Sequence, residues 1–319
     1  MAARRMAIIG LLLCLCLCIM PRYVYAASSA DAKEPIAVDS ECTLTVFYGY
    51  DGTVFPNQTV KLYKIADVSA DCWYTLTSAF ASSGLILNGV QTNGEWNVIR
   101  STLEAHILAY SIEPDATSVT DQNGQAVFEN LSAGLYLAIP EQVDGENLRC
   151  LFDSALIALP GLGADGFWQY QVEVSAKAEL LPPVEPDEEL QLKVLKLWKG
   201  DERRSDRPQS IEVEIFRDGI SYETVILSED NYWSYTWSVK DDGADWMVVE
   251  RNIPAEYTMT LEERGTSFIL TNTRLPDGAE DPDAPQTGDT ANGFLYILLM
   301  TVSGSVLIIL GSTGKRRSR

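Results

Sequence analysis

The sequence predicts an all-β protein built from tandem β-sandwich domains. Short segments in which apolar and polar residues alternate recur along the chain, as expected of strands that bury one face. Turn dipeptides such as Asp51-Gly52 and Asn123-Gly124 separate these segments. One helix is expected, over residues 96–110, where apolar side chains recur at helical spacing. Many short strands with frequent turns and little helix are typical of sandwiches.

The N-terminus reads as a secretory signal peptide over residues 1–26. Arg4 and Arg5 precede an unbroken apolar run over residues 7–20, and Val24-Tyr25-Ala26 supplies a small-residue cleavage site. The apolar run is too short to favour an uncleaved membrane anchor. We therefore expect cleavage between Ala26 and Ala27 and a secreted mature chain.

Segments rich in proline and acidic residues divide the mature chain into parts. The expected parts are a flexible leader (27–40), a first domain (41–178), a stiff linker (179–189), a second domain (190–274), an acidic stalk (275–283) and a C-terminal tail (284–319). In the first domain we expect strands at residues 43–47, 59–63, 126–128, 135–139, 155–160 and 168–174.

Composition excludes several classes of function. A formal net charge of −21 argues against binding to nucleic acid or to an anionic membrane. The sequence has no CxxC pair, glycine-rich phosphate loop or HExxH motif. Its one histidine, His106, falls on the apolar face of the expected helix, where a packed side chain is the ordinary interpretation. We expect no cofactor, no metal site and no metabolic enzyme activity.

Three cysteines remain after removal of the signal peptide, Cys42, Cys72 and Cys150, all in the first domain. Outside the cell they allow at most one disulfide, and the sequence does not choose among the three pairings. Small buried thiols are the alternative interpretation.

The C-terminal tail has an ordered series of parts. Ala284-Pro285-Gln286-Thr287-Gly288 precedes an apolar segment, residues 294–310, and a basic cluster, residues 315–319. The apolar segment is just long enough to span a bilayer, and the basic cluster would stay cytoplasmic. Taken alone, this order is that of a single-pass membrane helix.

The same order closely resembles the sorting signal read by sortases, with Ala284 where that signal most often has leucine. The resemblance implies cleavage between Thr287 and Gly288 and transfer of the Thr287 acyl group to an amine acceptor. The segment 294–310 would then hold only the precursor in the membrane.

Three polar residues of the second domain occupy unusual places. Lys196, Glu250 and Asn272 each alternate with apolar residues on one face of an expected strand, which places all three toward the core. Lys193 and Lys199 fall on the opposite face of the first of these strands. Burying any one of the three polar groups alone would be costly. The alternative is a surface lysine, a rim glutamate and a turn asparagine.

The chemistry of the three residues is complementary. A buried lysine amine loses its proton more readily, and a buried carboxylic acid keeps its proton. A neutral amine beside a carboxamide is a nucleophile beside an electrophile. A carboxyl group between them could carry protons while ammonia leaves. The expected product is an isopeptide bond between Lys196 and Asn272, formed once, with Glu250 as the catalytic group.

The second domain resembles the Cna B-type domain along nearly its whole length. The segments that carry the resemblance are Lys196-Leu197-Trp198, Arg207-Pro208-Gln209-Ser210-Ile211-Glu212-Val213, Phe216-Arg217-Asp218-Gly219, Asn231-Tyr232-Trp233-Ser234-Tyr235, Tyr257-Thr258 and Thr271-Asn272-Thr273. The resemblance implies a transthyretin-like or immunoglobulin-like β-sandwich. It also implies a bond between its first and last strands, made by Lys196 and Asn272 with Glu250 as the catalytic acid.

The first domain is similar to the N-terminal domains of Gram-positive pilin subunits. The segments concerned are Val60-Lys61-Leu62-Tyr63-Lys64-Ile65-Ala66-Asp67-Val68, Asp121-Gln122-Asn123-Gly124, Gly134-Leu135-Tyr136-Leu137, Leu159-Pro160 and Trp168-Gln169-Tyr170. Where crosslinking relatives have a lysine and a glutamate, this chain has Phe47 or Tyr48 and Pro140, so no isopeptide bond is expected here. Lys177 stands where polymerising pilins carry a reactive lysine, but the proline of their motif is missing, and we interpret it as an ordinary strand-end lysine.

These observations favour a cell-wall-anchored structural or adhesive surface protein, either a pilus component or a wall-bound adhesin. Its expected partners are a sortase, and then peptidoglycan or another pilin subunit as the covalent acceptor. A host or microbial surface ligand is a further expected partner. The alternatives are a carbohydrate- or protein-binding module displayed by the same anchor and, third, a surface hydrolase.

Overall fold

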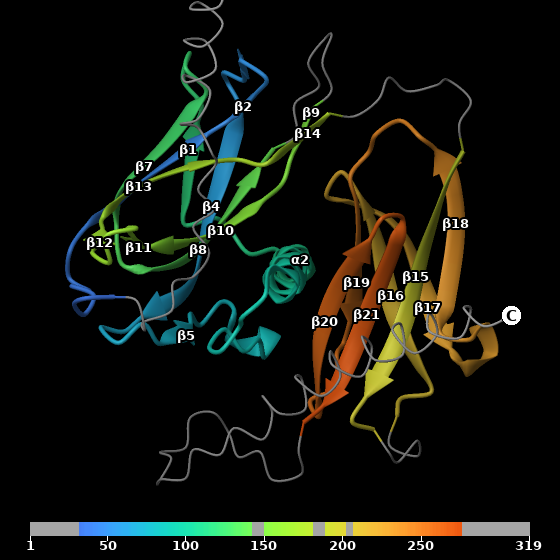
Figure 1. The fold of residues 1–319 in the computed structure, drawn as a ribbon. Coiled ribbons are helices and arrows are strands. Elements are labelled where there is room, and N and C mark those ends of the chain that lie inside the picture. The colour runs from blue at the N-terminus through green and yellow to red at the C-terminus, as the bar shows by residue number, and fades with distance from the viewer. Residues whose placement is uncertain (1–31, 142–149, 181–188, 202–206, 276–319) are drawn as a thin grey trace, which may run out of the picture. The chain divides into compact units, whose positions relative to one another are not determined.

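The computed structural model describes residues 32–141, 150–180, 189–201 and 207–275 (Figure 1). Strands dominate these residues, which confirms the expectation of an all-β protein. They contain one α-helix, α2 (Asn93–Tyr110), and two short 3-10 helices, Ala81–Ser83 and Glu229–Asn231. Among the residues described, no helix is both long and apolar enough to cross a membrane.

The predicted signal peptide, most of the linker, all but the first residue of the stalk, and the tail fall outside the described residues, and these assignments stay predictions.

Two main sheets make up the part of the chain before the linker. One has the strand order β13-β1-β7 and the other β10-β8-β4-β5, with β6 also paired to β4. The strands are β1 (Cys42–Phe47), β2 (Gly49–Tyr50), β3 (Thr53–Val54), β4 (Thr59–Val68), β5 (Tyr74–Leu76), β6 (Ala116–Val119), β7 (Gln125–Leu131), β8 (Gly134–Pro140), β9 (Cys150–Phe152), β10 (Ala155–Leu159), β11 (Gly161–Leu162), β12 (Trp168–Gln169), β13 (Gln171–Ser175) and β14 (Ala178–Leu180). The expected strand over 155–160 ends one residue earlier, and the expected strand over 168–174 is interrupted at Tyr170.

Helix α2 begins three residues before the expected start, because its N-terminus is capped. The Thr92 side chain accepts a hydrogen bond from Glu95 N, and the Glu95 carboxylate accepts one from Thr92 N. This capping box satisfies backbone donors that a helix start leaves open. One face of α2 packs through Ile99 and Leu103 in the same core as Leu135 of β8.

Two further sheets follow the linker. One has the order β18-β15-β21-β20 and the other β17-β16-β19. The strands are β15 (Glu189–Lys199), β16 (Ser210–Arg217), β17 (Ile220–Ser228), β18 (Ser234–Lys240), β19 (Trp246–Arg251), β20 (Tyr257–Arg264) and β21 (Ser267–Arg274). Apolar side chains from both sheets fill one core, including Val194 of β15, Val213 of β16 and Leu270 of β21. Two antiparallel-rich sheets around one core form a β-sandwich.

The first and last strands of this sandwich are parallel neighbours. Figure 1 shows β15, in yellow, beside β21, in orange, and residues 193–199 pair in register with residues 267–273. Within this pairing, Trp198 lies opposite Asn272 and Lys196 lies opposite Leu270. Parallel neighbours need a long connection between them. Here that connection is the rest of the sandwich.

The second face of α2 packs against this sandwich, a contact that periodicity alone did not predict. Ala105 belongs to the core of the second pair of sheets. Thr102 Oγ1 accepts a hydrogen bond of 2.9 Å from Leu261 N of β20, and donates one of 2.6 Å to Val98 O. β20 lies at the edge of its sheet. The Thr102 hydroxyl therefore satisfies an amide that strand pairing leaves open.

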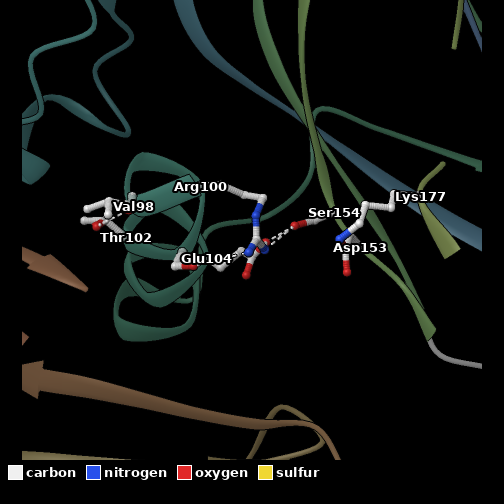
Figure 2. Close-up of polar contacts among 8 residues, drawn as sticks. Val98, Arg100, Thr102, Glu104, Asp153, Ser154 and Lys177 are labelled. Carbon is white, nitrogen blue, oxygen red and sulfur yellow. Dashed lines mark hydrogen bonds and ion pairs between the residues drawn. The ribbon is translucent and has the colours of Figure 1, made fainter. Parts of the chain in front are cut away.

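A polar network lies on another side of α2. Figure 2 shows Arg100 and Glu104 reaching from the helix toward Ser154. Arg100 Nη1 donates to Glu104 Oε1 at 2.9 Å and to Ser154 Oγ at 3.1 Å, and Ser154 Oγ donates to Glu104. The Glu104 side chain is only 14% exposed. Burial raises its pKa to about 7, the charges of Glu263 and Asp245 add to the rise, and Arg100 opposes it.

The raised pKa of Glu104 makes stability depend on pH in a defined direction. The unfolded carboxyl keeps its ordinary pKa, so between about pH 4 and about pH 7 the folded state binds more protons, and stability rises as pH falls. Glutamine is neutral at every pH, so the Glu104→Gln variant does not share this dependence. We therefore expect the free energy of unfolding of the variant, minus that of the wild type, to be larger at about pH 8 than at about pH 5.5. Denaturant unfolding at both pH values measures this. An equal difference at both would contradict it.

Candidate functional site

Lys196, Glu250 and Asn272 meet inside the second sandwich. Alternation along β15 buries Leu192, Val194 and Lys196, while Lys193 and Lys199 are exposed. Among the described residues, Lys196 is the one buried lysine. It is 2% exposed as a residue, Glu250 is 2% exposed and Asn272 is fully buried.

The three side chains come from three strands in two sheets. Lys196 and Asn272 lie on the parallel neighbours β15 and β21, and Glu250 comes from β19 in the other sheet. Glu250 therefore reaches across the core to the other two. The structure brings together the residues that strand alternation selected.

Glu250 bridges the other two side chains. Lys196 Nζ donates a hydrogen bond to Glu250 Oε2, and Asn272 Nδ2 donates one of 2.7 Å to Glu250 Oε1. Asn272 Oδ1 is buried without a hydrogen-bond partner among the described residues. Each carboxylate oxygen thus contacts one nitrogen. One of these nitrogens would attack in amide exchange and the other would leave.

Burial determines the protonation of the amine. Desolvation lowers the pKa of Lys196 to about 8, and the charge and hydrogen bond of Glu250 oppose that shift. A lysine with such a pKa has a neutral, nucleophilic fraction near neutral pH. The Lys196 side chain is 0% exposed, so water does not compete for the amine.

One aromatic ring lies over the amine, and two further rings pack against that ring. The centre of the Trp198 ring lies 4.9 Å from Lys196 Nζ. Trp233 and Tyr257 each meet that ring edge-on, with centroids 5.2 Å away. Sequence reasoning missed Tyr257 as part of the site. Its place as the first residue of β20, two residues before the buried Met259, was the available signal.

Other predicted site residues lie elsewhere. Ala26, Ala27 and residues 284–288 fall outside the described residues. Lys177 is 61% exposed at its side chain and forms an ion pair of 2.8 Å with Asp153, as Figure 2 shows. Tyr48 is one of the two residues that the sequence analysis placed at the lysine position of a crosslink in the first domain. It is buried and packs edge-on against Phe152, with ring centroids 5.1 Å apart.

The three cysteines that remain after signal removal are free thiols in the structure, and Cys42 and Cys150 are buried. Burial raises the pKa of Cys42 to about 11, so this thiol stays protonated.

Comparison with known families bears on the second sandwich. Residues 192–273, which include all three bridged residues, match the family model of the Cna protein B-type domain. A search of curated protein sequences gave no significant match.

Among solved structures, the chain is similar to a single B repeat unit of the collagen-binding surface protein Cna of Staphylococcus aureus. That similarity has 18% identity and a TM-score of 0.26, over 74% of this chain and 99% of that chain. The full-length major pilin SpaD of Corynebacterium diphtheriae gives 14% identity and a TM-score of 0.29, over 75% of this chain and 65% of that chain. A minor pilin of Streptococcus agalactiae gives 13% identity and a TM-score of 0.23, over 77% of this chain and 100% of that chain.

Removing Glu250 should destabilise the second sandwich. In a chain that carries Asn272→Ala and so cannot crosslink, Glu250→Ala leaves the Lys196 amine buried without its counter-charge, and breaking a buried pair in this way costs about 3–5 kcal/mol. Glu262→Ala is the matched control, because Glu262 pairs with Arg264 at the surface and exposed pairs contribute at most about 1 kcal/mol. Denaturant unfolding measures both. Similar losses in the two variants would contradict the bridging role.

Proposed function

We propose that this chain is a wall-anchored structural or adhesive surface protein whose second domain is locked by an isopeptide bond between Lys196 and Asn272. The observation that carries the proposal is the buried Glu250 bridge between a lysine amine and an asparagine carboxamide. The match of residues 192–273 to the Cna B-type domain supports it.

The reaction is an amide exchange that the three residues complete without a cofactor. Neutral Lys196 Nζ attacks Asn272 Cγ, and the amine gives a proton to Glu250 Oε2. The carboxyl group, whose Oε1 contacts Asn272 Nδ2, then passes this same proton on to that nitrogen. The bond from Cγ to Nδ2 breaks, one ammonia leaves, and a bond from Cγ to Nζ remains. Glu250 ends in its starting state, so it acts as an acid–base catalyst.

The position of the bond suits a protein under tension. β15 enters the sandwich and β21 leaves it, and Lys196 and Asn272 both lie near the C-terminal ends of these strands. Force applied at the two ends of the domain would run along β15, through the bond and out of β21. The sheets between residues 197 and 271 would carry none of it. The crosslink would also restrict the unfolded chain, as a disulfide does in the chain-entropy account.

Anchoring is the second part of the proposal. After signal cleavage between Ala26 and Ala27, a sortase would cleave between Thr287 and Gly288. It would pass the Thr287 acyl group to peptidoglycan or to another pilin subunit. Residues 294–310 would hold the precursor in the membrane until that step. The order of motif, apolar segment and basic cluster in the sequence supports this route.

Intact mass tests the crosslink. The mature chain should weigh one ammonia less than its sequence requires. Lys196→Ala, Asn272→Ala and Glu250→Gln should each restore the full sequence mass. Lys193→Ala, on the exposed face of the same strand, is the matched control, and its mass should still be one ammonia below the sequence mass. An unchanged wild-type mass, or a loss that persists in Lys196→Ala, would refute the bond.

Co-expression with a sortase tests the anchoring. A ladder of covalent multimers is expected of a pilus subunit, and a single wall-bound species of a monomeric wall protein. Thr287→Ala should abolish both, while Thr290→Ala, just beyond the cleavage site, should leave them unchanged. Electrophoresis of wall fractions gives the readout. Wall attachment that survives Thr287→Ala would contradict the proposed route.

A further inference from the structure

A buried ion pair lies next to the aromatic side chains near Lys196. It takes no part in the proposed crosslinking steps. Arg207 Nε donates to Asp201, and the Asp201 side chain is 0% exposed while that of Arg207 is 18% exposed. Asp201 follows the end of β15 and Arg207 precedes β16, so both come from the same connection. Burying such a pair adds little to stability compared with apolar residues of the same size. Its presence therefore calls for another reason.

The ion pair lies next to the same ring as the reacting amine. The guanidinium carbon of Arg207 lies 5.6 Å from the centre of the Trp198 ring, and Lys196 Nζ lies 4.9 Å from the same centre. Trp198 is also the register partner of Asn272. One indole thus lies beside both reacting residues and beneath Arg207.

Tyr257, the first residue of β20, also packs against Trp198. Its ring meets Trp198 edge-on, and its pKa is raised by burial and then by the nearby charge of Asp201. The pair and the aromatic rings therefore form one connected group at the end of the sandwich where Lys196 and Asn272 lie.

We propose that the Asp201–Arg207 pair clamps Trp198 as a plug that keeps water away from Lys196 and Asn272. Asp201 and Arg207 are then positioning residues for crosslinking, because they act through Trp198 and do not touch the reacting atoms. The inference rests on the proposed isopeptide bond and adds residues that set its rate.

The consequence is a shift in the pH dependence of crosslinking. Desolvation is the first cause of the lowered pKa of Lys196. Water admitted by a loosened plug would move that pKa from about 8 back toward its ordinary 10.5. The charged groups around the amine are Glu250 from β19, the Asp201–Arg207 pair from the connection after β15, and Arg274 near Tyr257. Of these, Glu250 contacts the amine directly and stays in place.

The test compares crosslinking rates across pH in a charge-neutral double variant. Asp201→Asn with Arg207→Met removes the pair without leaving an unpaired buried charge. The full chain is recovered unfolded, its unreacted mass is verified, and it is refolded from about pH 5.5 to about pH 9.5 while loss of ammonia is followed by intact mass. Below about pH 8 the double variant should crosslink roughly tenfold more slowly for each unit by which the Lys196 pKa rises. The two rates should converge at high pH.

Two further variants complete the experiment. Arg264→Met removes an arginine from an exposed pair in the same domain and should keep the wild-type profile. Trp198→Phe should shift the profile in the same direction as the double variant, which gives a second measurement if the double variant folds poorly.

The possible outcomes separate the two proposals. A wild-type chain that never loses ammonia would refute the isopeptide bond itself. Crosslinking in the wild type, with the same pH midpoint in the double variant and in Trp198→Phe, would overturn the plug alone. A uniform slowing at every pH would also overturn it, because that indicates slower folding and not a changed amine.

Discussion

The burial of the Lys196 amine is the constraint on which the second sandwich depends. A charged lysine is costly in a core, and an ion pair offsets that cost only with good geometry. The structure provides one partner across the core, Glu250, and one on the neighbouring strand, Asn272. Conversion of the three into an amide and a single carboxyl group would remove the buried ammonium altogether. The proposed reaction would thereby relieve the electrostatic cost that burial of the amine creates.

The strand topology determines how the proposed bond would affect the domain under force. Because β15 and β21 are the first and last strands and lie parallel, the proposed bond between them would close the whole domain into a loop. The same strands carry the chain in from the linker and out toward the tail. A bond placed elsewhere in the sheets would leave part of the domain open to unzipping. The side of β20 away from β21 is in turn covered by α2, where Thr102 accepts the Leu261 amide.

Much of this arrangement could be predicted from the sequence, and the limits have physical causes. Strand alternation places Lys196, Glu250 and Asn272 inward because a strand has a side-chain period of two, and the structure buries all three. The earlier start of α2 follows from the capping box of Thr92 and Glu95, a local signal that apolar periodicity does not contain. The contact of Asp201 with Arg207 joins two residues that lie outside the strands, so strand alternation does not encode it.

Peptide mapping by tandem mass spectrometry tests the central claim most directly, because it locates the bond as well as detecting it. After proteolysis of the mature chain, we expect one branched peptide in which the segment around Lys196 is joined through its side chain to the segment around Asn272, short of one ammonia. Recovery of the two segments only as separate linear peptides at their unmodified masses would contradict it.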